Sequence, residues 1–268
     1  LISQLRAPLQ NVSGILPQYY SALASAERLM ELESNEDEPL PAEKAELEKI
    51  KSDFRSIEVN NLCFGYGGEV ILNDCSFSAE RGHITAITGE SGSGKSTLFK
   101  LMLGLYEPQS GSITVNGNVP LDASLRGLFA YVPQGNMVLS GTVRDNITMC
   151  DPAITDEQIE KAARAAEIYD YIVSLPEGFE TRLAERGAGL SEGQIQRISI
   201  ARALLTDTPV ILLDEATSAL DEETETRVLT NIKSMTDKTI LFITHRNTSL
   251  KACDRIVHVE NKNFSVIK

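Results

Sequence analysis

A glycine-rich stretch in the first half of the chain ends in a lysine and two hydroxyl residues, reading Gly89-Glu90-Ser91-Gly92-Ser93-Gly94-Lys95-Ser96-Thr97. It fits the pattern G-x-x-x-x-G-K-[ST], with a short apolar run before it (84–88) and a helical pattern after it (97–105). Gly92 and Gly94 permit backbone angles closed to other residues, so successive N–H groups can turn inward onto a phosphate. The sequence therefore predicts a phosphate-binding loop between a strand and a helix.

The residues that end this loop predict how a nucleotide is bound. The helix N-terminus adds partial positive charge. We expect Lys95 to reach the β- and γ-phosphates and the Ser96 hydroxyl to bind Mg²⁺. The alternative is a glycine-rich turn without a ligand, and the strand–loop–helix setting favours the phosphate site.

Two carboxylates follow a second apolar run, residues 210–213. Ligands of open parallel sheets collect at the carboxyl ends of the strands, where Asp214 and Glu215 are expected. Asp214 suits Mg²⁺, directly or through water, and Glu215 could orient or deprotonate an attacking water. Such a pair alone could be a solvated strand end, but with the Lys95 loop it predicts a site for nucleotide hydrolysis.

Composition limits the class of protein. The 268 residues include 25 Lys and Arg against 38 Asp and Glu, for a net charge of −13. A surface this acidic argues against bulk attraction to nucleic acid or to anionic lipid. No apolar stretch approaches the roughly 18–20 residues that cross a bilayer. The four scattered cysteines (Cys63, Cys75, Cys150 and Cys253) are expected to be reduced packing residues.

The N-terminal part differs from the rest of the chain. Residues 1–33 have a helical apolar period, which Pro8 and Pro17 are expected to kink or interrupt. Residues 31–48 carry eight acidic residues and one lysine, which favours an acidic, solvated linker over 34–54 that leads into a short charged helix. The chain starts without an initiator methionine, so we expect it to be part of a longer protein.

An α/β pattern follows the linker. Strand patterns, antiparallel in the first two and buried in the others, span residues 56–64, 70–79, 84–88, 210–213 and 240–244. Helical patterns span 155–175 and 191–205. Thr155 or Asp156 can cap the first, and Ser191 with Gln194 resembles a capping box at the start of the second.

From about residue 56 to its end, the chain resembles the ATP-binding cassette of ABC transporters. The motifs that carry the resemblance, besides the Lys95 loop, are the aromatic Tyr66, the Q-loop Gln134, the signature Leu190-Ser191-Glu192-Gly193-Gln194, the D-loop ending in Asp221, and the switch histidine His245. The resemblance implies an α/β P-loop NTPase cassette over 55–268. It would have a mostly parallel core sheet, an N-terminal antiparallel β subdomain and a helical signature subdomain at about 135–205.

The resemblance also implies a mechanism. Two cassettes, identical or different, would pair head to tail with ATP between the Lys95 loop of one and Ser191, Gly193 and Gln194 of the other. The remaining implied roles are adenine stacking for Tyr66, Mg²⁺ binding for Ser96, Gln134 and Asp214, hydrolysis for Lys95, Gln134, Glu215 and His245, and communication with the opposite site for Asp221. Phosphoryl transfer needs charge neutralisation and positioning, which such residues provide.

The signature departs from the family pattern at two positions. Glu192 stands where glycine is usual, and Ile195 replaces the usual polar residue after Gln194. A carboxylate facing the γ-phosphate would repel it, so we predict that Glu192 points away from the nucleotide. The alternative is a weakened site that works with a different partner.

Three segments resemble those of exporters. They are an X-loop-like stretch at 181–187 with Glu185-Arg186-Gly187 intact, the stretch 141–147 after the Q-loop, and residues 25–31, which resemble the end of a last transmembrane helix. We therefore expect transmembrane domains before Leu1, partnership with them at the cytoplasmic face of the membrane, and no nucleic-acid partner. A soluble ABC-type ATPase and a separately encoded importer ATPase are the alternatives, and the transported substrate stays open.

Overall fold

The computed structural model describes residues 2–34, 37–135, 138–183, 189–235, 238–246 and 249–267. The chain divides into two compact units, residues 1–39 and 40–268. Among the described residues, no helix combines the length and the apolar character that a bilayer crossing requires.

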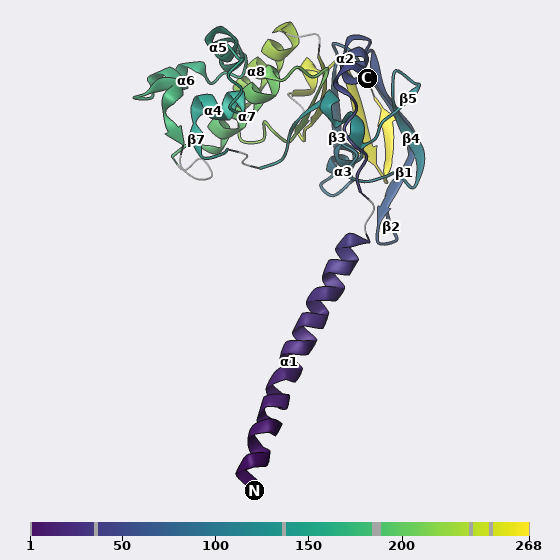
Figure 1. The fold of residues 1–268 in the computed structure, drawn as a ribbon. Coiled ribbons are helices and arrows are strands. Elements are labelled where there is room, and N and C mark those ends of the chain that lie inside the picture. Colours follow the sequence, from purple (N-terminus) through teal and green to yellow (C-terminus); the bar gives the residue numbers. More distant parts are fainter. Residues whose placement is uncertain are drawn as a thin grey trace. The chain divides into compact units, whose positions relative to one another are not determined.

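The first unit is one helix, α1 (Ile2–Glu33), which continues through Pro8 and Pro17 (Figure 1). The predicted interruption at these prolines was therefore wrong. A proline removes one N–H donor, and the turns on either side of each proline keep the helical conformation. Large apolar side chains on the second half of α1 are exposed, among them Tyr19, Tyr20 and Met30.

The second unit begins with a short helix, α2 (Lys44–Ser52), which the charge pattern predicted. Its apolar side chains are partly buried: Leu47 and Ile50, with Ala42 just before the helix, pack against an apolar core to which the antiparallel sheet and the core sheet both contribute. The second half of the acidic segment is thus attached to the folded unit.

An antiparallel sheet follows, in the strand order β2-β1-β4-β5. Its strands are β1 (Ser56–Tyr66), β2 (Glu69–Glu80), β4 (Ser110–Val115) and β5 (Val119–Pro120). The predicted antiparallel pairing of the first two strands is confirmed, with Ile57 opposite Ala79 and Val59 opposite Phe77.

The core sheet has the order β12-β11-β3-β10-β9-β6. Its strands are β3 (Ile84–Gly89), β6 (Phe129–Val132), β9 (Val210–Asp214), β10 (Thr239–Ile243), β11 (Arg255–Glu260) and the antiparallel edge β12 (Asn263–Val266). Every residue of β9 and β10 is buried. Side chains alternate along a strand, so the two faces of β9 enter different apolar cores. Ile211 and Leu213 join a core with apolar residues of 195–204, while Val210 and Leu212 join the core that includes the antiparallel sheet. The predicted, mostly parallel core sheet is confirmed.

Helices cover the sheet and form the helical part of the unit. They are α3 (Lys95–Met102), α4 (Val143–Thr148), α5 (Asp156–Ala165), α6 (Tyr169–Ser174), α7 (Glu192–Leu205) and α8 (Glu222–Met235). Short elements complete it: the pair β7 (Gly141–Thr142) and β8 (Arg182–Leu183), and the 3-10 turns η1 (Ala123–Leu128), η2 (Gly178–Glu180) and η4 (Ser249–Ala252).

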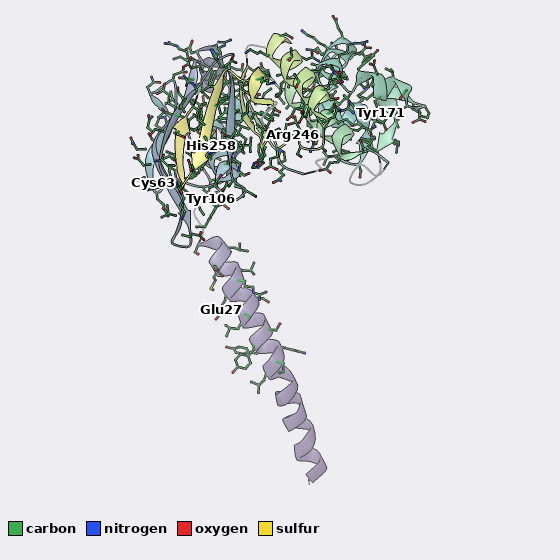
Figure 2. All side chains as sticks on the ribbon, turned by 180° about the vertical axis from the view of Figure 1, so that it is seen from behind. Glu27, Cys63, Tyr106, Tyr171, Arg246 and His258 are labelled. Atoms are coloured by element: carbon green, nitrogen blue, oxygen red, sulfur yellow. The ribbon has the colours of Figure 1, made fainter. Side chains whose placement is uncertain are left out.

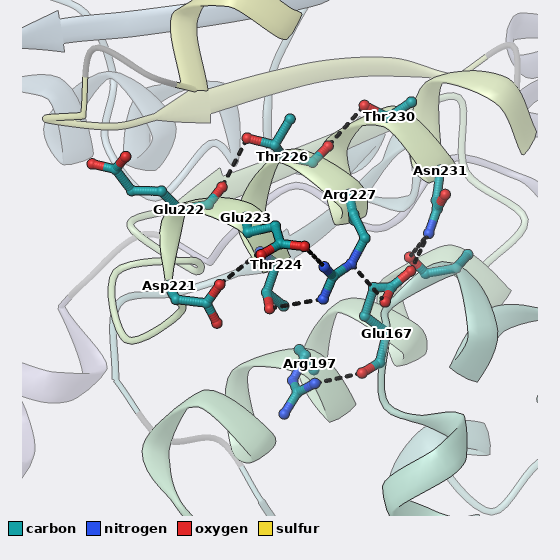
Figure 3. Close-up of polar contacts among 11 residues, drawn as sticks. Glu167, Arg197, Asp221, Glu222, Glu223, Thr224, Thr226, Arg227, Thr230 and Asn231 are labelled. Atoms are coloured by element: carbon teal, nitrogen blue, oxygen red, sulfur yellow. Dashed lines mark hydrogen bonds and ion pairs between the residues drawn. The ribbon is translucent and has the colours of Figure 1, made fainter.

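The single helix predicted over 155–175 is two helices, α5 and α6. The break lies at Glu167, whose φ of +56° is in the left-handed region. Its carboxylate binds Arg227, at 3.1 Å, and Asn231, at 2.7 Å, while its main-chain oxygen accepts from Arg197 (Figure 3). Contacts from α7 and α8 thus hold a helix-ending conformation that a residue with a side chain rarely adopts.

Candidate active site

The glycine loop connects β3 to α3, as its pattern predicts. Gly89 has a φ of +145°, and a Cβ there would lie 2.5 Å from the Val259 main-chain oxygen. Gly94 has a φ of +98°, and a Cβ there would lie 2.6 Å from Leu72 Cδ2. Both positions require glycine, and α3 begins directly after Gly94 at Lys95.

The Lys95 ammonium lies within this loop. Its Nζ donates to the main-chain oxygens of Gly89, at 3.0 Å, and Glu90, at 2.6 Å, and to Ser93 Oγ at 3.4 Å. Burial lowers the pKa of Lys95, and the charge of Glu215 opposes this effect. A cation held by weak neutral acceptors at the centre of a glycine loop is suited to binding a polyanion.

Asp214 ends β9 beside the start of α3. Its Oδ1 accepts from the Ser96 hydroxyl at 3.0 Å, and its Oδ2 accepts from the Tyr131 hydroxyl at 3.1 Å. Burial raises the pKa of Asp214, while these two hydrogen bonds lower it. A carboxylate and a serine hydroxyl are the oxygen ligands that Mg²⁺ prefers, so the donor set fits this ion. Tyr131 was not among the predicted site residues.

Glu215 follows Asp214 and lies between two other predicted catalytic residues. Gln134 Nε2 donates to Glu215 Oε2 at 2.8 Å, and His245 Nε2 lies 3.0 Å from Glu215 Oε1. Gln134 follows β6 and His245 follows β10, so the three side chains meet because β6, β9 and β10 are neighbouring parallel strands.

A cavity of about 650 Å³ joins the glycine loop to these catalytic residues. It is lined by Tyr66, Ile71, Ser91, Gly92, Gly94, Lys95, Ser96, Thr97, Gln134, Glu215 and His245. The volume lies in the range typical of sites for small ligands. Most of the residues predicted to bind one nucleotide thus surround one cavity.

Tyr66 belongs to a cluster of three aromatic rings at this cavity. Its ring meets Phe64 edge-on at 4.9 Å and Tyr106 at 5.2 Å between centroids (Tyr106 is labelled in Figure 2). Tyr66 is 38% exposed, so part of the ring remains available for a planar ligand. Tyr106 was not predicted from the sequence, because it joins the cluster from the segment after α3.

The signature residues form the N-terminus of α7, outside the lining of this cavity in the part of the chain that the structure describes. The predicted capping box is confirmed: Ser191 Oγ accepts from Gln194 N–H at 3.3 Å, and Gln194 Oε1 accepts from Ser191 N–H at 2.7 Å. Glu192 is exposed in the first turn, and a Cβ on Gly193 would lie 3.0 Å from the Ala219 main-chain oxygen.

Asp221 caps the start of α8. Its Oδ1 accepts from Thr224 N–H at 2.9 Å (Figure 3), and this hydrogen bond lowers the pKa of Asp221. The Asp221 carboxylate therefore binds Thr224 of its own chain. The resemblance implies for it the further role of communication with the opposite nucleotide site.

Two exporter-like segments lie side by side. β7, at the start of segment 141–147, pairs with β8, and Val143 N–H donates to the Thr181 main-chain oxygen at 3.0 Å. The predicted X-loop residues Glu185, Arg186 and Gly187 lie outside the described residues.

The glycine loop after β3 and the carboxylates at the end of β9 define a P-loop nucleotide hydrolase. A family model described as "ABC transporter" matches residues 72–218. The chain is 39% identical over 269 residues to a "Probable ABC transporter ATP-binding/permease protein" of Haemophilus influenzae, covering 99% of this chain and 48% of that protein. It is 40% identical to an "ATP-dependent lipid A-core flippase" of Desulfotalea psychrophila, covering 94% of this chain and 45% of that protein.

A solved structure agrees with these relatives. The chain superposes with a TM-score of 0.74 and 34% identity on a bacterial Atm1-family ABC exporter with ATP bound, covering 79% of this chain and 38% of that one. The chain belongs to the ABC transporter family. It contains the ATP-binding cassette that defines this family, a domain that hydrolyses ATP. It spans about half the length of the curated relatives described above.

Proposed function

We propose that this chain is the ATP-hydrolysing motor domain of an ABC exporter. The observation that carries the proposal is the position of Glu215, hydrogen-bonded to both Gln134 and His245, at the cavity that also contains Lys95. A carboxylate beside a phosphate loop, with a histidine and an amide on its two oxygens, is arranged to orient a water for attack on a γ-phosphate.

The residues at the cavity would each bind a different part of ATP and its Mg²⁺. The adenine would stack on the exposed part of Tyr66, the phosphates would accept from the loop N–H groups of 91–97, and Lys95 would turn from its main-chain acceptors toward the β- and γ-phosphates. Ser96, Asp214 and the Gln134 amide oxygen would hold Mg²⁺, which supplies charge neutralisation when bound. The Gln134 amide nitrogen is already used by Glu215, so its oxygen is the atom available to a cation.

The hydrolytic step is assigned to Glu215 and His245. Glu215 would accept a hydrogen bond from the attacking water and orient it in line with the β–γ bond. His245 would hold the γ-phosphate and this water, and Lys95 would stabilise the charge that develops on the transferring group.

A second cassette, identical or different, would complete the site. Ser191, Gly193 and Gln194 form an α7 N-terminus outside the lining of the chain's own cavity, so they are suited to a γ-phosphate bound by a partner. Glu192 would extend away from that phosphate into solvent. Hydrolysis would then reset the head-to-tail dimer, and Asp221 would link its two sites.

The names of the relatives support an exporter over a soluble ATPase or an importer subunit. They include the lipid A-core flippase above and the "Alpha-hemolysin translocation ATP-binding protein HlyB" of Escherichia coli, which is 37% identical over 97% of this chain. The domains that we propose are a helical end of a transmembrane domain at 1–33, a linker at 34–54 and the cassette at 55–268. The cassette would work at the cytoplasmic face of the membrane with transmembrane domains of the same transporter.

The test of the enzymatic part is phosphate release by the purified chain with ATP and MgCl₂. We expect turnover that stops when EDTA removes Mg²⁺ and that falls at least about 100-fold in the Glu215→Gln variant. A chain that binds no ATP, or that hydrolyses it equally well in EDTA, would contradict the proposal. Export is tested by whether the reading frame upstream of residue 1 encodes several apolar segments of about 20 residues.

A further inference from the structure

The backbone of Glu215 adopts an unfavourable conformation. Its φ is +51°, in the left-handed region that a residue with a side chain rarely occupies. Such a conformation persists only where the surrounding structure holds it in place. The loop that follows Glu215, residues 216–221, must therefore be fixed by contacts from other elements.

Arg246 supplies contacts of this kind. Its guanidinium donates hydrogen bonds to the main-chain oxygens of Ser218, at 2.6 Å, and Leu220. It also pairs with Glu225 Oε2 at 3.3 Å. Because Arg246 (labelled in Figure 2) directly follows His245, it links the backbone at the switch histidine to the loop after β9.

Glu225 anchors the arginine from α8. This carboxylate is 1% exposed, and a buried carboxylate is costly unless it is paired and hydrogen-bonded. Its partners are Arg246 on Oε2 and the Thr217 hydroxyl, which donates to Oε1 at 2.5 Å. Thr217 lies two residues after Glu215, so Glu225 holds both the loop and the arginine that binds it.

The signature helix α7 holds the loop from another side. The buried Gln196 donates from Nε2 to Ser218 Oγ at 3.0 Å, and its Oε1 accepts from Ala219 N–H at 3.0 Å. The loop is thus held from three parts of the chain: Gln196 of α7, Glu225 of α8, and Arg246, which directly follows His245 after β10.

These contacts lie against the catalytic pair. Glu215 and His245 line a small cavity of about 60 Å³ together with Thr217, Glu225 and Arg246. Arg246 is not among the described residues that line the 650 Å³ nucleotide cavity. It therefore contacts the loop that follows Glu215 without lining the cavity proposed for the nucleotide.

We propose that Arg246 is a positioning residue for hydrolysis: with Glu225 it holds the loop after β9 so that the Glu215 carboxylate keeps its place beside His245. The inference rests on the proposed function, because it assigns Arg246 a part in hydrolysis of the same nucleotide. A positioning residue acts on the turnover of bound ATP and leaves the binding of ATP nearly unchanged.

The first test is Arg246→Met in the purified chain, with Arg227→Met as the matched control. Arg227 lies on α8 and also pairs with two carboxylates, 2.7 Å from Glu223 on the same helix and 3.1 Å from Glu167 between α5 and α6; these contacts are drawn in Figure 3. We expect Arg246→Met to lower kcat about 10- to 100-fold, the cost of a displaced catalytic group, with KM and Kd for ATP changed less than about threefold. Arg227→Met is expected to leave these values within about twofold.

A second variant separates positioning from folding, because Arg246→Met leaves Glu225 buried and unpaired. The double variant Arg246→Met/Glu225→Gln removes that charge and is expected to recover Tm without recovering kcat. Arg246→Lys is expected to recover kcat in part, since an ammonium reaches fewer of the acceptors.

A double variant with native Tm and native kcat would overturn the inference, as would a Kd for ATP that rises as much as kcat falls. A failure of the proposed function looks different: the unsubstituted chain would then neither bind nor hydrolyse ATP.

Discussion

Lys95 is held inside the glycine loop by neutral main-chain oxygens, so its charge remains available to a phosphate. We predict that Lys95→Ala weakens ATP binding at least about 10-fold, because charge-assisted hydrogen bonds contribute roughly 1.5–3 kcal/mol, and that it abolishes hydrolysis. Titration with a fluorescent ATP analogue and a phosphate-release assay measure both. Lys161→Ala, at an exposed position of α5, is the control and is expected to change neither.

Glu215 uses both carboxylate oxygens as acceptors, one for Gln134 and one beside His245. Glu215→Gln keeps the size of the side chain but removes the basic oxygen that would orient and deprotonate water. We predict that kcat falls about 10²- to 10⁴-fold, the usual contribution of general base catalysis, while ATP affinity stays within a few-fold. Single-turnover kinetics measure the step directly. A variant that turns over ATP at the native rate would refute the assignment of Glu215 as the base.

Glu192 is exposed in the first turn of α7, where a carboxylate interacts favourably with the helix dipole. We predict that Glu192→Gly lowers stability by about 0.5–1 kcal/mol and changes the ATPase rate less than about twofold. Glu157→Gly, in the first turn of α5, is the matched control for stability. A large gain in ATPase rate would show instead that Glu192 weakens the signature.

At the level of elements, α4 and α7 are joined by the buried side chain of Asn146. It accepts from Leu139 N–H at 2.8 Å and donates to the main-chain oxygens of Leu139 and Thr142 at 2.9 and 3.0 Å. Arg202 of α7 donates from Nη2 to Asn146 Oδ1 at 3.1 Å. This arrangement fixes segment 141–147 against the signature helix.

Asn146→Ala would leave the Leu139 amide and the Arg202 guanidinium without this partner in a partly buried region. We predict a loss of about 2–4 kcal/mol in the free energy of unfolding, since each unsatisfied buried polar group costs roughly 1–3 kcal/mol. Urea denaturation measures it. Asn118→Ala, at an exposed position in the turn before β5, is expected to change stability by less than about 0.5 kcal/mol. Equal effects of the two substitutions would contradict the role of Asn146.

Local patterns predicted those elements whose cause is local. The glycine loop, β3 and the capping box at Ser191 all follow from residues within a few positions of one another. The break between α5 and α6 could not be predicted in this way, because Glu167 keeps its left-handed conformation through Arg197 and Arg227, which lie 30 and 60 positions away.

The same limit applies to the site. Gln134, Glu215 and His245 are separated by 81 and 30 positions, so their meeting depends on strand order, which the family resemblance implied and periodicity did not. Arg246 and Glu225 were not predicted as site residues, because their contribution depends on which loop they contact in the folded chain.

At the scale of the whole molecule, the acidic charge is unevenly distributed. Residues 31–48 include eight of the acidic residues and one lysine, and they precede the sheet that carries the phosphate loop. The net charge of −13 is thus compatible with a nucleotide site, because glycine N–H groups, the α3 N-terminus and Lys95 make a local electropositive region.

The same charge makes pairing of two chains depend on nucleotide. Two chains of charge −13 repel one another, and the contact proposed to join them is a γ-phosphate bound by one chain with the α7 N-terminus of the other. We predict a monomer without nucleotide and with ADP, and a dimer for Glu215→Gln with ATP and Mg²⁺. Light scattering coupled to size exclusion measures the mass. A dimer that forms equally well with ADP would contradict the γ-phosphate contact, because ADP lacks the group on which the contact depends.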